Sequence, residues 1–347
     1  MRIGFDVSPL HRPHPRGIVR VASGLVDALE RRRGLEIVRL APDRGENLRR
    51  WRAVELPRAA REQALDGIHS CVSAFAASGR GARVQTIHEV PWKHGAREGA
   101  DLRHRVWVAL GPMLADAVIT ATEFVARDLR RRFLPGAGKI RVCPWGVGPP
   151  FQGESPPETV DEVVLGRYRL PQGPFAVAPG AVRPKKNLAA ILNGMAELRK
   201  RGGTMLQLVV TGGDTPQLRR DLGLVSRLGL ARFVTTIDEI ADADMPSVLR
   251  LASAVPVLSH SEGFGLPVLE ALACGTPVVV PRGSAQAEVA GAAGLEVDAS
   301  DPASVAGGLE AALAQRETLR PRLAARAAEL TWDRCAAQVE SIWKEIA

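Results

Sequence analysis

The sequence of 347 residues lacks the features of several large classes of protein. Aromatic residues make up only 4% of it, with a single tyrosine, and no apolar run approaches the ~18 residues that a membrane-spanning helix needs. The first ten residues have no basic segment followed by an apolar stretch, so we expect a first strand there rather than a signal peptide. Hydrophobic residues account for 46% of the chain, which is typical of a globular protein with a sizeable core.

Cysteine and the common catalytic signatures are also sparse. The four cysteines, Cys71, Cys143, Cys274 and Cys335, are far apart and form no C-x-x-C or Cys/His cluster. This spacing predicts neither a disulfide framework nor a metal site, and it fits a reducing cytoplasmic compartment. A P-loop, a G-x-G-x-x-G after a strand, a G-x-S-x-G elbow and an H-E-x-x-H motif are absent. These absences exclude the P-loop and NAD-binding classes.

Acidic residues are scarce in the first part of the chain. Residues 1–150 hold 26 Lys and Arg against 15 Asp and Glu, whereas the remainder holds 20 against 23, so the net charge of +8 arises in the first half. A solvated, arginine-rich surface explains this excess. So does attraction to an anionic partner such as an acidic membrane surface, a lipid phosphate or another anionic acceptor. No nucleic-acid-binding motif accompanies the charge, so we do not expect a nucleic-acid partner.

Strand-like and helix-like segments alternate along the chain, which predicts an α/β fold with parallel sheets and crossover helices. The expected strands are residues 2–7, 35–40, 83–88, 117–121, 140–144, 175–179, 205–211, 234–237, 254–258 and 278–280. The expected helices are residues 18–32, 101–115, 123–133, 187–201, 218–228, 244–252, 266–274, 301–314, 319–328 and 332–346. Residues 48–77 show no clear period.

A Pro- and Gly-rich stretch, residues 144–157, predicts the crossing between two domains. We expect an N-terminal Rossmann-like domain over residues 1–155, a C-terminal one over residues 156–328, and a last amphipathic helix within residues 329–347. In doubly wound sheets, ligands bind beyond the carboxyl ends of the strands. The polar loops that follow the strands are therefore the candidate sites.

The most informative stretch, residues 254–281, predicts a strand, a polar loop, a helix and a second strand. Gly263 and Gly265 in the loop let the backbone approach a ligand closely. The helix start behind them has unpaired N–H groups and the positive end of a dipole, which suits a phosphate. Glu262 and Glu270 flank this anion site and are suited to accept hydrogen bonds from hydroxyls. A phosphate beside several hydroxyls describes a sugar nucleotide.

This stretch also resembles a known family. The run EGFGLPVLE at residues 262–270, continued by ALACGTPVV, is similar to the E-x7-E signature of the family-4 retaining glycosyltransferases. The alternative, a glycine-containing turn before an ordinary amphipathic helix, would suit a bare E-x7-E spacing but not the whole string. The resemblance covers most of the chain and is strongest over residues 180–298. It implies the GT-B fold, in which two Rossmann-like domains face a cleft and the last helix packs back on the N-terminal domain.

The resemblance also implies roles for the donor side. Glu270 is expected to bind the ribose hydroxyls and Glu262 the hydroxyls of the donor sugar. Lys186 matches the family lysine that holds the diphosphate. The backbone that would share this work belongs to Gly263, Phe264, Gly265 and Leu266. Because cations and a helix end can neutralise the leaving diphosphate, no metal and no further cofactor are expected.

A second loop, between the strand at 175–179 and the next helix, carries three cations, Arg183, Lys185 and Lys186. Cations at a strand end and a helix start form an anion pocket. The family has an arginine where this chain has Ala181. Either Arg183 or Lys185 replaces that arginine, and the sequence leaves the choice open.

Two residues of the first half are similar to family residues on the sugar side. His88, in the segment TIHE, resembles the histidine of a Thr-x-His-Asp motif, with Glu89 in place of the aspartate. A lone histidine at a strand end is otherwise structural. Gly17 precedes the first predicted helix and resembles the first glycine of a Gly-Ile-Gly-Arg-Tyr segment, although Val19 and Val21 replace the second glycine and the tyrosine.

Three further residues carry narrower predictions. Thr122 is expected to cap the helix at 123–133, with a ligand contact as the minority alternative. Trp145 stands where the family has an asparagine, so it either alters acceptor contacts or packs at the hinge. Pro256 interrupts a predicted buried strand, where it removes a ladder hydrogen bond.

The sequence thus predicts a retaining, metal-independent glycosyltransferase that moves a sugar from a nucleotide diphosphate sugar to a hydroxyl acceptor. A nucleotide-sugar 2-epimerase of the same fold is one alternative. A non-catalytic protein that binds nucleotide sugars is another, and the Ala181 substitution keeps it open. We expect a cytoplasmic protein, with peripheral contact at the inner face of the membrane left open. The base, the sugar, the anionic or lipid-linked nature of the acceptor, the linkage and the oligomeric state stay unassigned.

Overall fold

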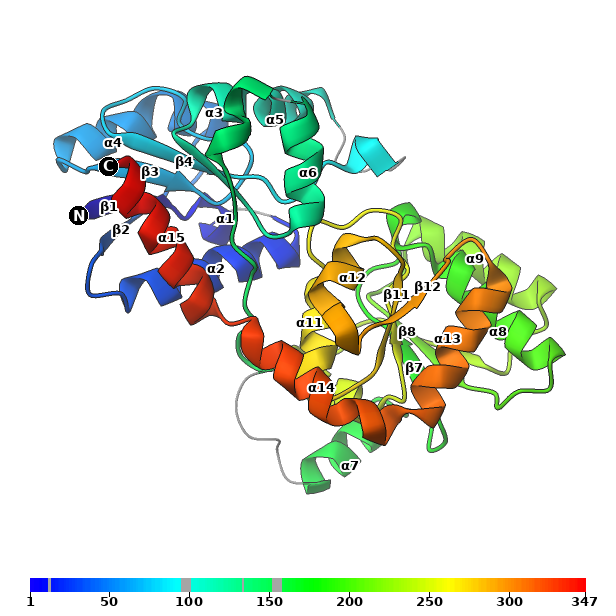
Figure 1. Ribbon diagram of the computed structural model, residues 1–347. Helices are drawn as coiled ribbons and strands as arrows, with labels where there is room; N and C mark the ends of the chain where they lie inside the picture. The colour runs from blue at the N-terminus through cyan, green and yellow to red at the C-terminus, as the bar shows by residue number, and fades with distance from the viewer. Residues whose placement is uncertain (12–13, 95–100, 133, 152–157) are drawn as a thin grey trace. The chain divides into compact units, whose positions relative to one another are not determined.

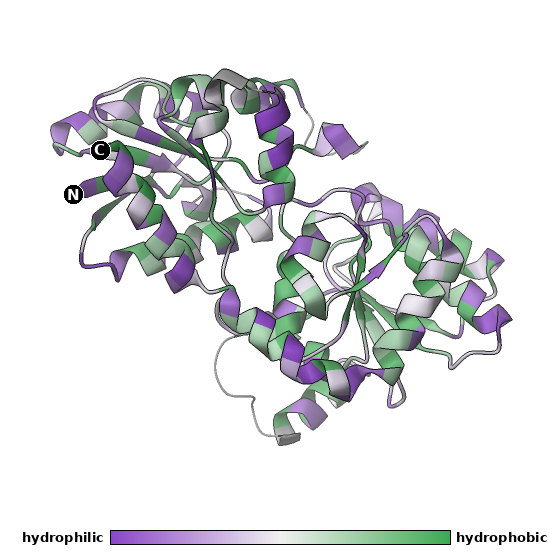
Figure 2. Ribbon diagram, viewed as in Figure 1, coloured by the Kyte–Doolittle hydropathy of each residue, from purple (hydrophilic) through white to green (hydrophobic). Residues whose placement is uncertain are grey.

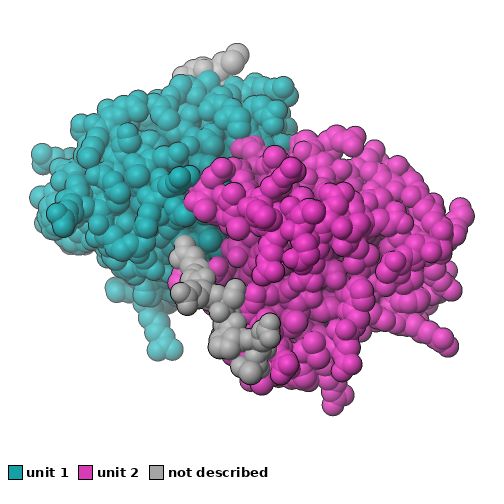
Figure 3. All heavy atoms as spheres, turned by 60° about the horizontal axis from the view of Figure 1, so that its bottom comes forward, with its two compact units in different colours: residues 1–148, 330–347 teal, residues 149–329 magenta. Residues whose placement is uncertain are grey.

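The computed structural model describes residues 1–11, 14–94, 101–132, 134–151 and 158–347. It divides the chain into two compact units, shown in Figure 3. Unit 1 comprises residues 1–148 and 330–347, and unit 2 comprises residues 149–329. The sequence places these boundaries after residues 155 and 328. Residues 152–157 of the predicted crossing lie outside the described residues.

Unit 1 is built on a six-stranded parallel sheet with the strand order β2-β1-β3-β4-β5-β6. Its central strands are buried on both faces, as parallel sheets covered by crossover helices require. Ile3, Phe5 and Ile119 are fully buried, each with 0% of its surface exposed. The strands are β1 (Arg2–Asp6), β2 (Glu36–Leu40), β3 (Gly67–Ser70), β4 (Ala82–Thr86), β5 (Ala117–Thr120) and β6 (Ile140–Val142).

Helices cover this sheet, as Figure 1 shows. They are α1 (Ser8–His11), α2 (Arg16–Glu30), α3 (Leu48–Arg50), α4 (Leu56–Glu62), α5 (Leu102–Leu114), α6 (Glu123–Arg132) and α15 (Trp332–Ile346). Shorter turns of helix are the π-helix η1 (Trp51–Glu55) and the 3₁₀ segments η2 (Pro91–His94) and η3 (Leu134–Lys139). The predicted cap of α6 is confirmed, because the Val125 N–H donates to Thr122 Oγ1 at 3.3 Å.

The last helix, α15, packs against α2 within unit 1, which confirms the predicted return of the chain (Figure 1). Its buried face includes Val339 and Trp343, both with 0% of their surface exposed. Ion pairs tie the helix to the rest of the unit, namely Arg31–Asp333 at 2.7 Å, Arg32–Glu340 at 2.5 Å and Arg141–Glu345 at 2.6 Å.

Unit 2 has two three-stranded parallel sheets with the orders β7-β8-β9 and β10-β11-β12. A single bridge between Ala176 and Ala254 joins them, through the Val177 N–H that donates to the Ala254 carbonyl at 3.0 Å. The strands are β7 (Phe175–Ala178), β8 (Gln207–Thr211), β9 (Val234–Ile237), β10 (Val255–Pro256), β11 (Val278–Pro281) and β12 (Leu295–Val297).

Pro256 marks the point at which the two sheets part. The flanking Val255 and Val257 both donate their N–H groups to β11, at 2.9 Å each. In a parallel ladder the residue between them donates to the opposite neighbour, which here is β7. Proline has no N–H to donate, so the pairing of β10 with β7 ends after the bridge at Ala254. The proline therefore shortens the predicted strand 254–258 and opens the sheet at its carboxyl end.

The helices of unit 2 surround both sheets, and Figure 2 shows hydrophilic residues on their outer faces. They are α7 (Glu158–Arg167), α8 (Leu188–Lys200), α9 (Pro216–Arg227), α10 (Met245–Leu251), α11 (Leu266–Ala273), α12 (Ala285–Ala290), α13 (Pro302–Ala314) and α14 (Arg316–Glu329), with 3₁₀ segments η4 (Pro184–Lys186) and η5 (Gly291–Ala293). Within the described ranges, no helix is long and apolar enough to cross a membrane.

Candidate active site

Two loops of unit 2 follow the carboxyl ends of β7 and β10 and lie against each other. Residues 180–187 after β7 form the cation loop, and residues 259–265 after β10 form the glutamate loop. The His260 N–H donates to the Lys185 carbonyl at 2.8 Å, and Asn187 Nδ2 donates to the Leu258 carbonyl at 3.1 Å. Loops beyond the carboxyl ends of parallel strands are where such folds bind ligands.

The central contact between the loops is an ion pair. Lys186 Nζ lies 2.8 Å from Glu262 Oε1, and Ser259 Oγ donates to the same oxygen at 3.1 Å. Both side chains of the pair are mostly buried, with 20% of Lys186 and 14% of Glu262 exposed. In the part of the chain that the structure describes, no group donates to the second oxygen, Oε2. One oxygen of Glu262 is thus held by the protein.

The charge state of Glu262 follows from this setting. Burial opposes ionisation, but the positive charges of Lys186 and Lys185 and the hydrogen bonds from Lys186 and Ser259 outweigh it, so the pKa of Glu262 falls to about 2. The carboxylate therefore stays ionised at neutral pH and can only accept hydrogen bonds.

The remaining cations of the cation loop differ in burial. Lys185 has 8% of its surface exposed, and its charge contributes to the lowered pKa of Glu262. Arg183 is half-buried and lies just before the 3₁₀ turn η4, where its carbonyl accepts the Lys186 N–H at 2.8 Å. Ala181 is exposed. Lys185 therefore acts on the glutamate electrostatically.

The glutamate loop leads directly into α11 through a left-handed residue. Gly265 has φ 97° and ψ 59° and precedes Leu266, the first residue of the helix. A side chain there would be strained, and its Cβ would lie 3.3 Å from Gln286 Cγ of α12. Gln286 in turn donates from Nε2 to the Ser259 carbonyl at 3.2 Å. The N-terminus of α11 is therefore held at the end of the glutamate loop.

Glu270 lies in the middle of α11 and has 7% of its surface exposed. Its charge acts on Cys274, one turn later. Burial raises the pKa of the Cys274 thiol to about 12, and the charge of Glu270 contributes in the same direction. Glu270 is thus a buried acid of α11, the helix that directly follows the loop of Glu262.

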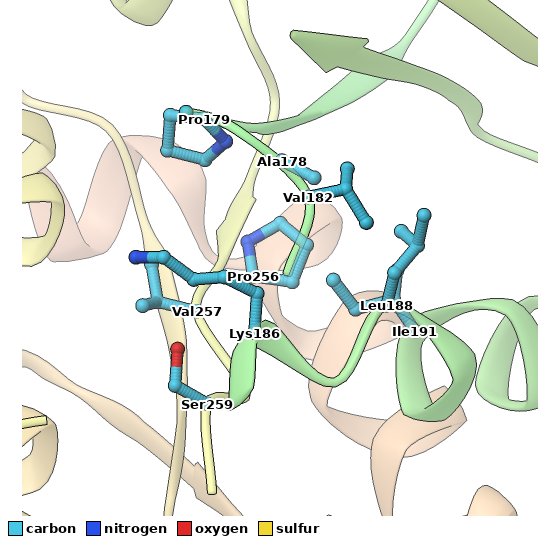
Figure 4. A pocket seen from close by; sticks show the side chains of 10 residues that line it. Ala178, Pro179, Val182, Lys186, Leu188, Ile191, Pro256, Val257 and Ser259 are labelled. Carbon is cyan, nitrogen blue, oxygen red and sulfur yellow. The ribbon is translucent and has the colours of Figure 1, made fainter. Parts of the chain in front are cut away.

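A pocket lies beside the loops, at the ends of β7 and β10 (Figure 4). Lys186 of the cation loop and Ser259 of the glutamate loop both line it, as does Pro256 at the parting of the sheets. The other lining residues are Ala178, Pro179, Gly180, Val182, Leu188, Ile191 and Val257. The ion pair of Lys186 and Glu262 therefore adjoins an open, largely apolar hollow.

His88 belongs to unit 1 and follows β4. Its Nε2 lies 2.8 Å from the Cys71 carbonyl, which can only accept, so Nε2 carries the proton and Nδ1 is an acceptor when the ring is neutral. Burial lowers the pKa of His88, more than the hydrogen bond to Cys71 raises it. The ring lies 6.0 Å from that of Trp145.

Two expectations about unit 1 are refined by the structure. Gly17 was expected in the loop before the first helix, but α2 begins at Arg16, so Gly17 occupies its first turn. The apolar period that marks a helix does not extend to its first, solvent-facing residues, which is why the start was placed too late. Trp145 has 2% of its surface exposed and stacks on Trp332 with 6.3 Å between ring centroids, as expected of the packing alternative.

Several site residues were missed by sequence reasoning. Asn187 and Gln286 hold the two loops through contacts between residues far apart in the sequence, and Ser259 contacts Glu262 within its own loop. In unit 1, Asp6 is fully buried at the end of β1 and accepts hydrogen bonds from Trp51 Nε1 at 3.1 Å and from Arg52 Nε at 3.3 Å.

Over the described ranges, no three His, Cys, Asp or Glu side chains are placed to hold a metal ion.

Comparison with known families and structures bears on this site. Residues 169–329 match the family model of the group 1 glycosyl transferases. Unit 2 therefore belongs to the group 1 glycosyl transferases. The matched region contains both loops, the Lys186–Glu262 pair and Glu270. The resemblance predicted from the E-x7-E run is confirmed.

Among curated relatives of this chain is the O-antigen chain mannosyltransferase B of Escherichia coli, which is 27% identical over 233 residues, 66% of this chain and 61% of that protein. A D-inositol 3-phosphate glycosyltransferase of Stackebrandtia nassauensis is 32% identical over 240 residues, 64% of this chain and 52% of that protein. The chain thus spans less than two thirds of the length of these relatives.

Solved structures resemble the whole chain in fold. A sucrose-phosphate synthase from Thermosynechococcus elongatus has a TM-score of 0.75 at 18% identity, with 99% of this chain and 98% of that chain covered. HepE from Anabaena, in complex with UDP and glucose, has a TM-score of 0.74 at 17% identity, with 99% and 100% covered. The predicted α/β class, the GT-B fold with two Rossmann-like domains, is confirmed.

Proposed function

We propose that this chain is a retaining, metal-independent glycosyltransferase that moves a sugar from a nucleotide diphosphate sugar to a hydroxyl acceptor. The observation that carries the proposal is the pairing of Lys186 with one oxygen of Glu262 beside the N-terminus of α11. A cation and a helix start suit a diphosphate, and an ionised carboxylate suits sugar hydroxyls. The membership of unit 2 in the group 1 glycosyl transferases supports the same chemistry.

In this proposal each donor-side residue has one task. Lys186 and the backbone of residues 263–266 stabilise the charge that develops on the leaving diphosphate. Lys185 takes the place of the family arginine, which is Ala181 in this chain, because the charge of Lys185 acts on Glu262. Glu262, ionised at neutral pH, accepts hydrogen bonds from the donor sugar through Oε2. Glu270 accepts hydrogen bonds from the ribose.

The residues of unit 1 complete the proposal on the sugar side. His88 is proposed to contact a sugar hydroxyl as a neutral ring whose Nδ1 accepts a hydrogen bond. The first turn of α2, with Gly17, is proposed to approach the transferred sugar. The acceptor is a hydroxyl compound, and the positive charge of the first half of the chain favours one that is anionic or held at an anionic lipid surface.

A thermal-shift screen against nucleoside diphosphates and their sugars tests the donor site. Ligands that bind only the folded chain raise its melting temperature by mass action, so the correct donor should give the largest increase. UDP, GDP, ADP and their glucose or mannose derivatives form the panel, and the free bases and sugars are the controls. If none of the nucleoside diphosphates raises the melting temperature, the proposed donor site is wrong.

The two alternatives make different predictions with the donor that binds. A 2-epimerase would convert the nucleotide sugar into its epimer without an acceptor. A non-catalytic binding protein would bind the donor and leave it intact. A transferase would release the nucleoside diphosphate and pass the sugar to an acceptor or, slowly, to water.

A further inference from the structure

Asn187, the last residue of the cation loop, has an unusual backbone. Its φ of 55° and ψ of 43° place it in the left-handed region, where residues other than glycine are uncommon. It is one of three such residues in the described part of the chain, with Ala64 and Arg169. Asparagine adopts this region more readily than other residues with a side chain, so it suits a left-handed turn at the end of a 3₁₀ segment.

The side chain of Asn187 does not do what its place in the sequence suggests. Asparagine directly before a helix usually caps it by accepting a backbone N–H of the first turn, but Asn187 makes no such bond to α8. Its Nδ2 instead donates to the carbonyl of Leu258, the residue directly before the glutamate loop, at 3.1 Å. The Asn187 side chain thus contacts the chain beside the glutamate loop and does not cap α8.

This contact lies next to the ion pair. Asn187 directly follows Lys186, and Leu258 directly precedes Ser259, which donates to the same Glu262 oxygen as Lys186. The His260 N–H and the Lys185 carbonyl join the loops a second time, at 2.8 Å. The left-handed turn ends the 3₁₀ segment at Lys186, and the amide of Asn187 attaches that end to the glutamate loop.

We infer that Asn187 is a positioning residue that holds Lys186 in place for the diphosphate of the donor. It acts in two ways, through a left-handed backbone that turns the chain after Lys186 and through the amide that ties this turn to Leu258. The inference rests on the proposed role of Lys186 in the donor site. It adds a residue that touches no ligand itself but sets where the cation lies.

Two substitutions separate the two contributions. Asn187→Gly keeps the left-handed backbone, because glycine adopts it freely, and loses only the amide contact. Losing one hydrogen bond should weaken binding of the selected nucleoside diphosphate by about 3–10-fold. Asn187→Ala also loses the preference for the left-handed region and should weaken binding by roughly a further 5–30-fold. Arg169→Gly, at the exposed left-handed residue after α7, is the control and should leave the affinity unchanged.

A double-mutant cycle with Lys186→Ala then tests whether Asn187 acts through the lysine. The affinities of the wild type, the two single variants and the double variant are measured by calorimetry with whichever of UDP, GDP or ADP binds the wild type. If Asn187 only positions Lys186, Asn187→Gly should weaken binding no further than about 2-fold once the lysine is gone.

The outcomes distinguish this inference from the proposed function. Additive losses in the double variant, or equal affinities of Asn187→Gly and the wild type, would overturn the role of Asn187 and leave the donor site standing. A wild-type chain that binds none of the three diphosphates overturns the donor site and this inference with it. A melting temperature that falls while the affinity is unchanged would show that Asn187 serves stability alone.

Discussion

At the scale of single residues, the site depends on the ion pair between Lys186 and Glu262. Lys186 pairs with Glu262 Oε1, so its side chain is already held in one orientation when a diphosphate enters the site. Preorganised charges of this kind stabilise the transition state more than the bound substrate. The ion pair is therefore expected to affect turnover more strongly than donor affinity.

Lys186→Ala tests this expectation. Removing a group that stabilises developing charge costs roughly 2.7–4 kcal/mol, so kcat should fall by about 10²–10³. Lys200→Ala, at an exposed lysine at the far end of α8, the helix that follows the cation loop, is the matched control and should keep the wild-type kcat. Steady-state kinetics with the donor found by thermal shift makes the comparison. A normal kcat in Lys186→Ala would remove the lysine from the mechanism.

The lowered pKa of Glu262 predicts how its contribution to stability depends on pH. Its pKa is about 2 in the folded chain, below the ordinary value of 4.5, so the contribution is present above pH 4.5 and is lost as the pH falls through 2. Glu262→Gln should therefore lower the free energy of unfolding by on the order of 3 kcal/mol at pH 7 and by much less near pH 2.

Denaturant unfolding at several pH values measures this difference. Glu317→Gln, an exposed acid on α14, should show almost no difference at any pH and serves as the control. A penalty for Glu262→Gln that stays constant from pH 7 to pH 2 would mean that the pKa of Glu262 is not lowered in the folded chain.

The residues of the donor site divide into those that sequence can reveal and those that it cannot. Glu262, Gly265 and Glu270 lie within one local run, so their spacing alone indicates the site. Asn187 and Ser259 act across 71 and 3 residues respectively, and the first of these contacts depends on the folded arrangement of the two loops. No local pattern distinguishes an asparagine that caps a helix from one that ties two loops together.

At the scale of elements, close approach between helices limits what side chains are tolerated. A Cβ added at Gly24 of α2 would lie 2.3 Å from Trp332 Cε2 of α15. The two helices can pack as they do only because this position has no side chain. The same tryptophan stacks on Trp145, which links the packing to the segment that leaves β6.

Gly24→Ala should therefore destabilise unit 1. Forcing an extra methyl group into a filled core costs typically about 1–3 kcal/mol. Gly307→Ala in α13, where a Cβ meets no atom within 4 Å, is the control and should be neutral or stabilising by about 0.5–1 kcal/mol. Thermal and denaturant unfolding of the three chains measures the effect. Equal stability of Gly24→Ala and the wild type would contradict the packing described for α2 and α15.

Elements with a strong apolar period were predictable, and short ones were not. The strand β9 and the helix α15 have the predicted bounds. The strand β3 was missed because its four residues, GIHS, include buried His and Ser that carry no strand signal. The π-helix η1 lies in the region 48–77 that showed no clear period, because its i→i+5 bonds break the helical spacing.

At the scale of the whole molecule, the alternation of strands and helices was enough to predict two Rossmann-like units. The sequence also shows the excess of positive charge in the first half of the chain, but not what that charge binds. The helix α5 adds one observation, since Leu102, Val106 and Met113 lie on one face and have 76%, 44% and 68% of their surfaces exposed. Arg103 and Arg105 flank this face on the helix.

An exposed apolar stripe flanked by arginines suits an anionic lipid surface. We predict that the chain sediments with vesicles that contain phosphatidylglycerol and not with neutral phosphatidylcholine vesicles. Replacing Leu102 and Met113 with serine should reduce the bound fraction several-fold, whereas serine at Leu222, an exposed leucine of α9, should not. Equal sedimentation with both kinds of vesicle, or with neither, would contradict a role for this face at a membrane.

The central proposal is that the Lys186–Glu262 site transfers a sugar from a nucleotide donor. Proton NMR of the selected nucleotide sugar, incubated with the chain, a panel of hydroxyl acceptors and excess chelator, tests this transfer. We predict release of the nucleoside diphosphate and a product whose anomeric proton keeps the donor configuration, at a rate reduced by about 10²–10³ in Lys186→Ala. A donor that is bound but left intact, converted into its epimer or consumed only without chelator would contradict it.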